Sequence, residues 1–384
     1  MEKKEILNLF TKKGLILDSK TLDFFTENQE LIEVFFERIK GLQLPPVIKT
    51  DFIHSIVGKK EEVLFEEIKK EVFDKDVVSI EDVSTILTER YNKLQKFFTN
   101  RLELVNLISV NKISEKMKKF SLIVMVREID REEKSVLVED LTGEVRIKVK
   151  EEFLNVLMED EVIGVICEKN NGIEAVNLLW PDIPLKKTIP KIEEEVLCVF
   201  LHPLFFQKDF EAKIEKFKSK IRELNFKKNY IFFFSENEEL VEKVRGSLPF
   251  NWELIVITNK KFSKDLKNTY VFLSPVYLNF SKKLIMLLVS GEIISEYQKV
   301  WKMKNEEVML NLLKKRCLGK FNINKVKEDL IIDPVPDIFV SYGFGSSSSI
   351  NYKGTTIISC GLDEEKMFWI VNLATRETLK INLD

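Results

Sequence analysis

The chain has 384 residues, enough for two to four domains, and 45% of them are hydrophobic, which excludes global disorder. Its 60 basic and 62 acidic residues give a net charge of -2, so nucleic acid could be held only by a local basic patch. No run reaches the roughly 18 apolar residues of a membrane span, and the amino terminus lacks the apolar core of a signal peptide. We therefore expect a cytoplasmic protein with no membrane partner.

Histidine and cysteine are scarce. The only histidines are His54 and His202, whereas hydrolytic metal sites usually use several imidazoles and acyl-transfer triads need one beside the nucleophile. The cysteines, at positions 167, 198, 317 and 360, form no C-x-x-C pair. This spacing favours reduced intracellular thiols over a zinc knuckle.

Residues 1–75 are predicted to form a helical module. An apolar stripe with helical spacing runs through residues 22–39, and the Pro-Pro pair that follows interrupts it. A second stripe consists of Leu64, Ile68 and Val72, spaced four residues apart. A short helical module ahead of the main body is often a docking or tethering domain.

Residues 76–115 are predicted to form a connecting helix laid on the next domain. Ser79 and Asp82 have the spacing of a capping box, in which each side chain bonds the other residue's backbone N–H. Apolar residues between 86 and 98 then recur along one helical face.

Residues 116–185 are predicted to form a small barrel of the oligonucleotide/oligosaccharide-binding (OB) type. Four or five short strands, separated by polar turns, fit within about 60 residues, and Thr142-Gly143 marks one hairpin. Residues 119–150 hold seven basic and seven acidic groups, and the exposed aromatics of a base-stacking platform are missing. A structural or interdomain role is therefore favoured over single-strand binding.

Residues 190–384 follow a proline-containing linker and are predicted to form a two-sheet sandwich with helices outside. Strands alternate with helices and then follow one another directly, a pattern typical of such layers. Strands are expected at 196–202, 229–235, 253–259, 283–291, 337–340, 354–360, 368–373 and 378–383, and helices at 210–224, 239–248 and 306–319, the last ending at Gly319. The fold class is α+β.

A glycine- and serine-rich loop, residues 341–349, lies between two of these strands. Such loops often carry the chemistry of α/β proteins, yet this one has no His, Asp, Glu, Cys or Lys. A phosphate-cradling loop would open a helix and carry a lysine, whereas this chain continues as strand. A nucleophilic serine among residues 346–349 would lack a neighbouring histidine base.

Several segments follow one another along the chain: ERYNKL, SLIVMVREI, VEDLTGEVRIKV, EDEVIGV, WPDIP, LLKKRCLG and IIDPVPDIF. In this order they resemble the small subunit of the archaeal D-family DNA polymerase and the B-subunits of eukaryotic replicative polymerases. The resemblance implies an OB barrel packed on a calcineurin-like αββα phosphoesterase sandwich. In archaeal members that sandwich is a metal-dependent 3′–5′ exonuclease, and the subunit binds a large catalytic subunit.

The metal motifs of that family are degenerate in this chain. Two divalent cations would need carboxylate, imidazole and amide ligands on several strand ends. His202 and Asn259 keep the family's residue type, but Lys260 places a cation where a metal would bind. The family positions fall on Phe200, His202, Ser235, Asn259, Lys260, Ser290, Gly343 and Gly345. We therefore expect an inactivated phosphoesterase domain without catalytic residues, metal ligands or a cofactor.

The expected function is that of a pseudo-exonuclease small subunit, which forms a heterodimer with the large catalytic subunit and scaffolds it in DNA replication. DNA and a sliding clamp are further candidate partners. One alternative is an active metal-dependent exonuclease with a rearranged site that uses Glu236, Glu238, Asp265 or His202. The other alternative is a single-stranded-DNA-binding OB module.

Overall fold

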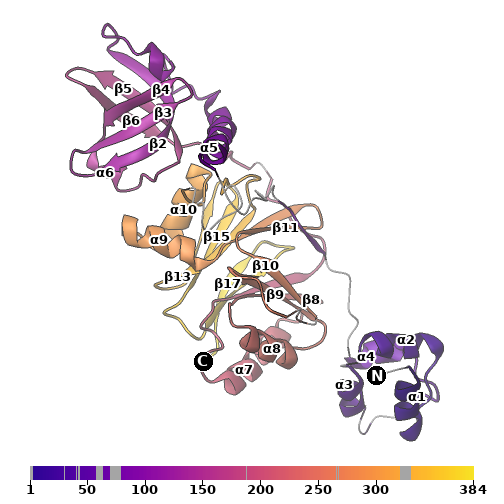
Figure 1. Cartoon of the computed structure of the whole chain (residues 1–384). Coiled ribbons are helices and arrows are strands. Elements are labelled where there is room, and N and C mark those ends of the chain that lie inside the picture. The colour runs from indigo at the N-terminus through magenta and orange to yellow at the C-terminus, as the bar shows by residue number, and fades with distance from the viewer. Residues whose placement is uncertain are drawn as a thin grey trace.

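The computed structural model describes residues 3–384 apart from residues 30, 40, 42–43, 58–63, 70–78, 187, 265, 267 and 321–329. A group of short helices at the amino terminus, a closed barrel and a two-sheet sandwich follow one another along the chain (Figure 1). The predicted α+β class is confirmed.

The amino-terminal helices pack around a cluster of phenylalanines. Phe10, Phe25 and Phe35 are fully buried, and the ring centroids of Phe10 and Phe25 lie 4.7 Å apart. Aromatic pairs at this distance add about 0.5–1.5 kcal/mol beyond the area they bury, which helps helices this short to form a core. The helices are α1 (Lys3–Lys12), α2 (Ser19–Glu27), α3 (Leu31–Arg38) and α4 (Thr50–Val57).

The second predicted helical stripe is wrong. Leu64 and Ile68 flank a strand, β1 (Phe65–Glu67), which pairs antiparallel with β11 (Val276–Phe280) in the sandwich. Residues four apart share a face in a strand as well as in a helix, so the spacing alone does not distinguish the two. Val72 lies outside the described residues.

Helix α5 (Ile80–Gln95) begins at the predicted capping box, which is confirmed. The Ser79 hydroxyl accepts from the Asp82 N–H at 3.1 Å, and the Asp82 carboxylate accepts from the Ser79 N–H at 3.0 Å. Two 3₁₀ turns follow, η1 (Lys96–Phe98) and η2 (Val110–Lys112). The buried face of α5 packs against the outside of the barrel, where the Tyr91 hydroxyl donates to the Ile123 carbonyl at 2.9 Å.

The barrel closes in the order β2-β3-β4-β6-β5, and a short helix, α6 (Glu151–Leu154), lies between β4 and β5 along the chain. Long strand β2 pairs with β5 over residues 119–125 and with β3 over residues 125–130, and a bulge at Arg127 interrupts the pairing with β3. Inward-pointing side chains are apolar and fill the interior. The strands are β2 (Lys119–Asp130), β3 (Ser135–Asp140), β4 (Gly143–Lys148), β5 (Val162–Lys169) and β6 (Ile173–Leu179).

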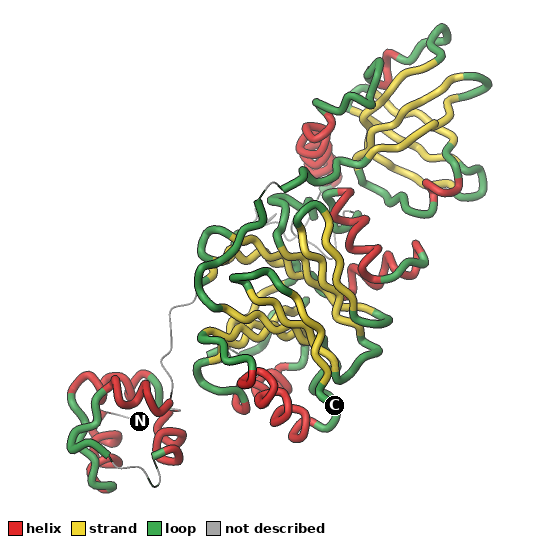
Figure 2. The backbone as a smooth tube through the Cα atoms, turned by 180° about the vertical axis from the view of Figure 1, so that it is seen from behind, coloured by secondary structure: helices red, strands yellow, loops and turns green. Residues whose placement is uncertain are grey.

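Two six-stranded sheets stack face to face in the sandwich, with helices on both outer surfaces (Figure 2). The first sheet has the order β10-β9-β8-β7-β16-β17, and the second β1-β11-β12-β13-β15-β14. The first contains β7 (Val196–Leu201), β8 (Lys228–Phe234), β9 (Trp252–Thr258), β10 (Thr269–Leu273), β16 (Met367–Asn372) and β17 (Thr378–Asn382). The second adds β12 (Leu284–Leu288), β13 (Ile338–Gly343), β14 (Ser348–Tyr352) and β15 (Thr355–Gly361).

Helices α7 (Phe210–Glu223) and α8 (Glu238–Ser247) cover the first sheet, and α9 (Gly291–Trp301) and α10 (Asn305–Lys315) cover the second. The last of these ends before the predicted Gly319, because Arg316 adopts the left-handed conformation (φ 56°). The Arg316 guanidinium donates to the Ile332 carbonyl at 2.7 Å and to Asp333 at 3.1 Å. These long-range bonds hold a non-glycine residue where a helix usually ends on glycine.

The barrel and the sandwich meet at a buried ion pair. Glu161, just before β5, accepts a hydrogen bond of 2.6 Å from Lys315 at the end of α10, and the two side chains are 0% and 1% exposed. Glu161 also accepts from the indole N–H of Trp180 and the backbone N–H of Met158. Every partner of this carboxylate is therefore a hydrogen-bond donor, which is the condition for burying a charge.

Candidate functional site

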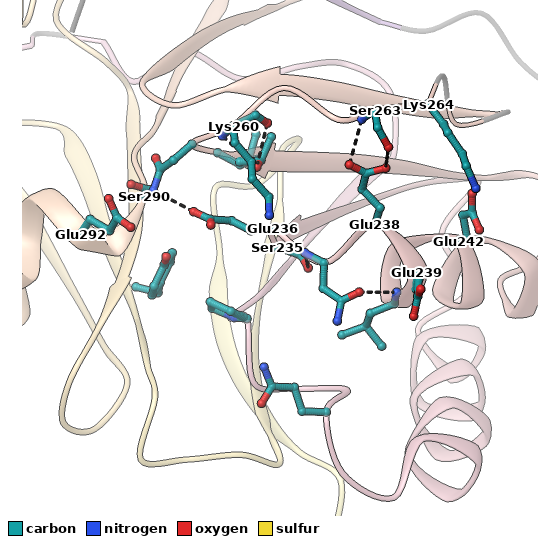
Figure 3. A pocket seen from close by; sticks show the side chains of 18 residues that line it. Ser235, Glu236, Glu238, Glu239, Glu242, Lys260, Ser263, Lys264, Ser290 and Glu292 are labelled. Carbon is teal, nitrogen blue, oxygen red and sulfur yellow. Dashed lines mark hydrogen bonds between the residues drawn. The ribbon is translucent and has the colours of Figure 1, made fainter. Parts of the chain in front are cut away.

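The carboxyl ends of several strands meet at one edge of the sandwich, around a cavity of about 750 Å³ (Figure 3). Ser235 follows β8, Asn259 and Lys260 follow β9, and Ser290 follows β12, and all four line the cavity. Open α/β sheets usually bind ligands at such an edge. Phe200, His202, Gly343 and Gly345 are not among the lining residues, so this cavity brings together only part of the predicted set.

His202 uses both ring nitrogens within the protein. Its Nδ1 accepts from the Leu204 N–H at 3.2 Å, and its Nε2 lies 3.3 Å from the Glu364 carbonyl. A carbonyl only accepts, so Nε2 carries the proton. The side chain is 1% exposed, and burial lowers the pKa of His202 to about 4. His202 is thus a neutral, fully bonded residue at a strand end.

Phe200 points away from the cavity. It is fully buried between the two sheets, and its ring stacks on Phe232 with centroids 5.0 Å apart. Side chains alternate along a strand, so a carboxylate in its place would stand in the apolar core between the sheets rather than at the cavity.

Gly343 stands where an imidazole would overlap a neighbouring side chain. A Cβ atom at this glycine would lie closer than 3.0 Å to the amide group of Asn305. That amide donates to the Phe344 carbonyl at 2.7 Å and so fixes the loop after β13. Gly345 has φ +98°, the left-handed region that favours glycine. Asn305 is a residue that the sequence reasoning missed, because only the fold brings α10 beside β13.

Carboxylates outnumber cations around the cavity. Glu236, Glu238, Glu239, Glu242 and Glu292 line it, against Lys260 and Lys264. The Glu236 carboxylate accepts from the Asn259 amide at 3.1 Å. Glu238 accepts from the hydroxyl and backbone N–H of Ser263, and these hydrogen bonds lower the pKa of Glu238. The excess negative charge disfavours a phosphodiester backbone in this cavity.

The residues present do not fit the two divalent cations that the family resemblance implies. Two-metal sites place cations about 3.5–4 Å apart on shared ligands, whereas Glu236 and Glu238 here accept from separate neighbours. In the described part of the chain, no group of three or more His, Cys, Asp or Glu side chains is placed to hold a metal ion. Asp265, a candidate ligand in the alternative, lies outside the described residues.

The outer face of β3 and β4 lacks the features of a single-strand platform. Neither strand carries an aromatic residue, and bases stack on aromatics in such proteins. Arg146 on this face is paired with Glu128 at 3.2 Å, and Glu139 and Glu144 stand opposite each other. The face is thus neither basic nor aromatic.

One curated protein is similar to this chain. No family model matches the chain. The chain is 21% identical over 233 residues to the DNA polymerase II small subunit of Thermoplasma acidophilum, a match that covers 56% of this chain and 46% of that protein. The chain is thus matched to about half of its relative's length, and its resemblance to this subunit is confirmed.

Two solved structures are also similar. An archaeal phosphodiesterase is 10% identical, with a TM-score of 0.32, and the match covers 48% of this chain and 99% of that one. A protein from Thermus thermophilus is 10% identical, with a TM-score of 0.30, and the match covers 50% of this chain and 100% of that protein.

Among the described helices, none is long and apolar enough to cross a membrane.

Proposed function

We propose that the chain is a non-catalytic small subunit of an archaeal D-family DNA polymerase, where it scaffolds the large catalytic subunit. The observation that carries the proposal is the cavity at the strand ends. It is lined by Lys260 and Ser290, and the Asn305 amide fills the space beside Gly343. The match to a DNA polymerase II small subunit supports the polymerase role.

A scaffold has to hold its domains in a fixed arrangement. Several hydrogen bonds at the joint between the barrel and the sandwich support such a role. Besides the Glu161–Lys315 pair, Arg101 donates to the carbonyls of Trp180 and Pro181, at 3.2 and 2.9 Å. Arg90 is fully buried and donates to the Gly319 carbonyl at 3.2 Å. Helix α5, the barrel and the sandwich are therefore tied by several charged hydrogen bonds, which are stronger than neutral ones.

The partner is tested by co-expressing the chain with the large subunit from the same genome. We expect the two to elute together as a heterodimer at micromolar concentration. Separate elution would remove the basis of the proposal.

The absence of catalysis is tested with the purified full chain, Mn²⁺ and end-labelled single-stranded DNA. We expect no release of nucleotides above that of the matched His202→Ala variant. If Mn²⁺ supports release by the unaltered chain and His202→Ala abolishes it, the chain is an active exonuclease with a rearranged site and the proposal is wrong.

A further inference from the structure

A groove of about 350 Å³ lies between α5, strand β2 and the hairpin that joins β3 to β4. Its floor is apolar, formed by Val83, Leu87, Tyr91 and Met125. At its edges stand Ile80, 89% exposed, and Leu141, 61% exposed. Two large aliphatic side chains therefore face solvent on either side of a groove that already presents apolar surface.

Burying either side chain would be favourable. Apolar surface removed from water is stabilised by roughly 25 cal/mol per Å², or about 1.5–3 kcal/mol for a whole leucine or isoleucine side chain. Single exposed aliphatic residues are common, but exposed apolar groups around a groove are typical of interaction sites. Ile80 is the first residue of α5, and Leu141 lies in the turn of the β3–β4 hairpin.

The charged residues that line the groove, Arg127, Glu139 and Asp140, carry a net negative charge. Glu139 lines the groove, and Glu144 stands directly opposite it across the β3–β4 ladder. Like charges in this position are destabilising. Arg127 reaches Glu139 at 3.2 Å, but it also pairs with Asp160 at 3.0 Å. Glu144 has no ion-pair partner among the described residues, which leaves a negative charge beside Leu141.

We propose that this groove binds an amphipathic helix of a partner protein whose apolar face is flanked by lysine or arginine. The apolar side chains of such a helix would cover Ile80 and Leu141, and its cations would neutralise Glu139 and Glu144. Helix-in-groove recognition has this form. The inference rests on the proposed function in one respect, because the large subunit is the protein that supplies the helix.

The experiment measures the affinity of the full chain for the large subunit, with two matched variants. Leu141→Lys removes the apolar edge and adds a repelling charge. Leu379→Lys makes the same change at a leucine of similar exposure, 57%, on edge strand β17 of the sandwich. We expect Leu141→Lys to weaken binding about tenfold or more, the effect of a central contact, and Leu379→Lys to leave it within about twofold. Glu144→Gln should reduce the dependence of the affinity on salt.

Equal binding by Leu141→Lys and the unaltered chain would overturn the inference and leave the proposed function standing. Failure of the unaltered chain to bind the large subunit would instead contradict the proposed function. Thermal unfolding of both variants checks that they fold. A photo-crosslinking residue at Ser84, which is exposed and lines the groove, identifies the occupant. We expect a basic, apolar segment of the large subunit, and crosslinks confined to this chain would contradict the inference.

Discussion

Lys315→Met is expected to loosen the joint between barrel and sandwich. Lys315 is 1% exposed, contacts Glu161 at 2.6 Å and stands 4.7 Å from the centroid of the Trp180 ring. Burial lowers the pKa of Lys315, and the Glu161 carboxylate opposes that shift. Methionine keeps the length of the side chain but leaves the Glu161 carboxylate without its cation.

The magnitude follows from the environment of the pair. Removal of one partner from a buried ion pair costs about 3–5 kcal/mol, because the remaining charge is desolvated without compensation. Glu161 would keep its bonds from Met158 and Trp180, so we expect the lower half of this range, about 3–4 kcal/mol. The double variant Lys315→Met/Glu161→Gln should lose less than Lys315→Met alone, since no charge is left unpaired and the Gln carbonyl still accepts from Trp180.

Urea unfolding followed by tryptophan fluorescence measures these free energies, because Trp180 and Trp301 both face Lys315. The matched control is Lys134→Met. Lys134 pairs with Glu151 at 3.0 Å, but the two side chains are 59% and 71% exposed. Exposed pairs contribute about 0–1 kcal/mol. If Lys315→Met costs no more than Lys134→Met, the buried pair does not hold the joint.

Three further predictions concern single residues. The buried imidazole of His202 has a pKa of about 4 in the folded chain, so the unfolded chain binds the proton more tightly. As the pH falls from 6.5 to 4, this residue should therefore lower the free energy of unfolding by up to about 3 kcal/mol. A His202→Asn variant should lack this component in urea titrations at several pH values. Gly343→Ala should lower the unfolding temperature, because the added Cβ would overlap Asn305. The control Gly246→Ala, in open space on α8, should raise the unfolding temperature slightly. Equal shifts of the two variants would contradict the close contact at Gly343. Ser79→Ala should cost about 1 kcal/mol by removing the cap of α5, as measured by urea unfolding, and a loss near zero would contradict the cap's role.

Local signals in the sequence predicted much of the sandwich. The residues of β7, β8 and β9 are nearly all buried, so they appear as uninterrupted apolar runs typical of parallel strands. The capping box before α5 was equally visible, because it depends on two residues three apart. Such features require no knowledge of distant contacts.

Other elements depend on contacts that no local pattern reveals. Strand β14 pairs only with β15 at the sheet edge, and its first two residues, Ser348 and Ser349, lie in the predicted loop. Helix α9 was not predicted, nor were β10 and β11. The end of α10 at Lys315 depends on Arg316 reaching Ile332 and Asp333.

The candidate site was only partly predictable for the same reason. Lys260 and Ser290 could be placed at strand ends from their positions in the sequence. The packing of Asn305 against Gly343 and the two bonds of His202 could not, because they join segments far apart in the chain. The sequence showed which family residues were replaced, and the structure shows what fills their space.

One measurement tests the central proposal most directly. The large subunit, with and without the full chain, is given Mg²⁺ or Mn²⁺, nucleotides and a labelled primer with a mismatched 3′ end. We expect the chain to increase primer extension and to cause no shortening of the primer. Shortening that depends on the chain, or extension that is the same without it, would contradict a non-catalytic scaffold.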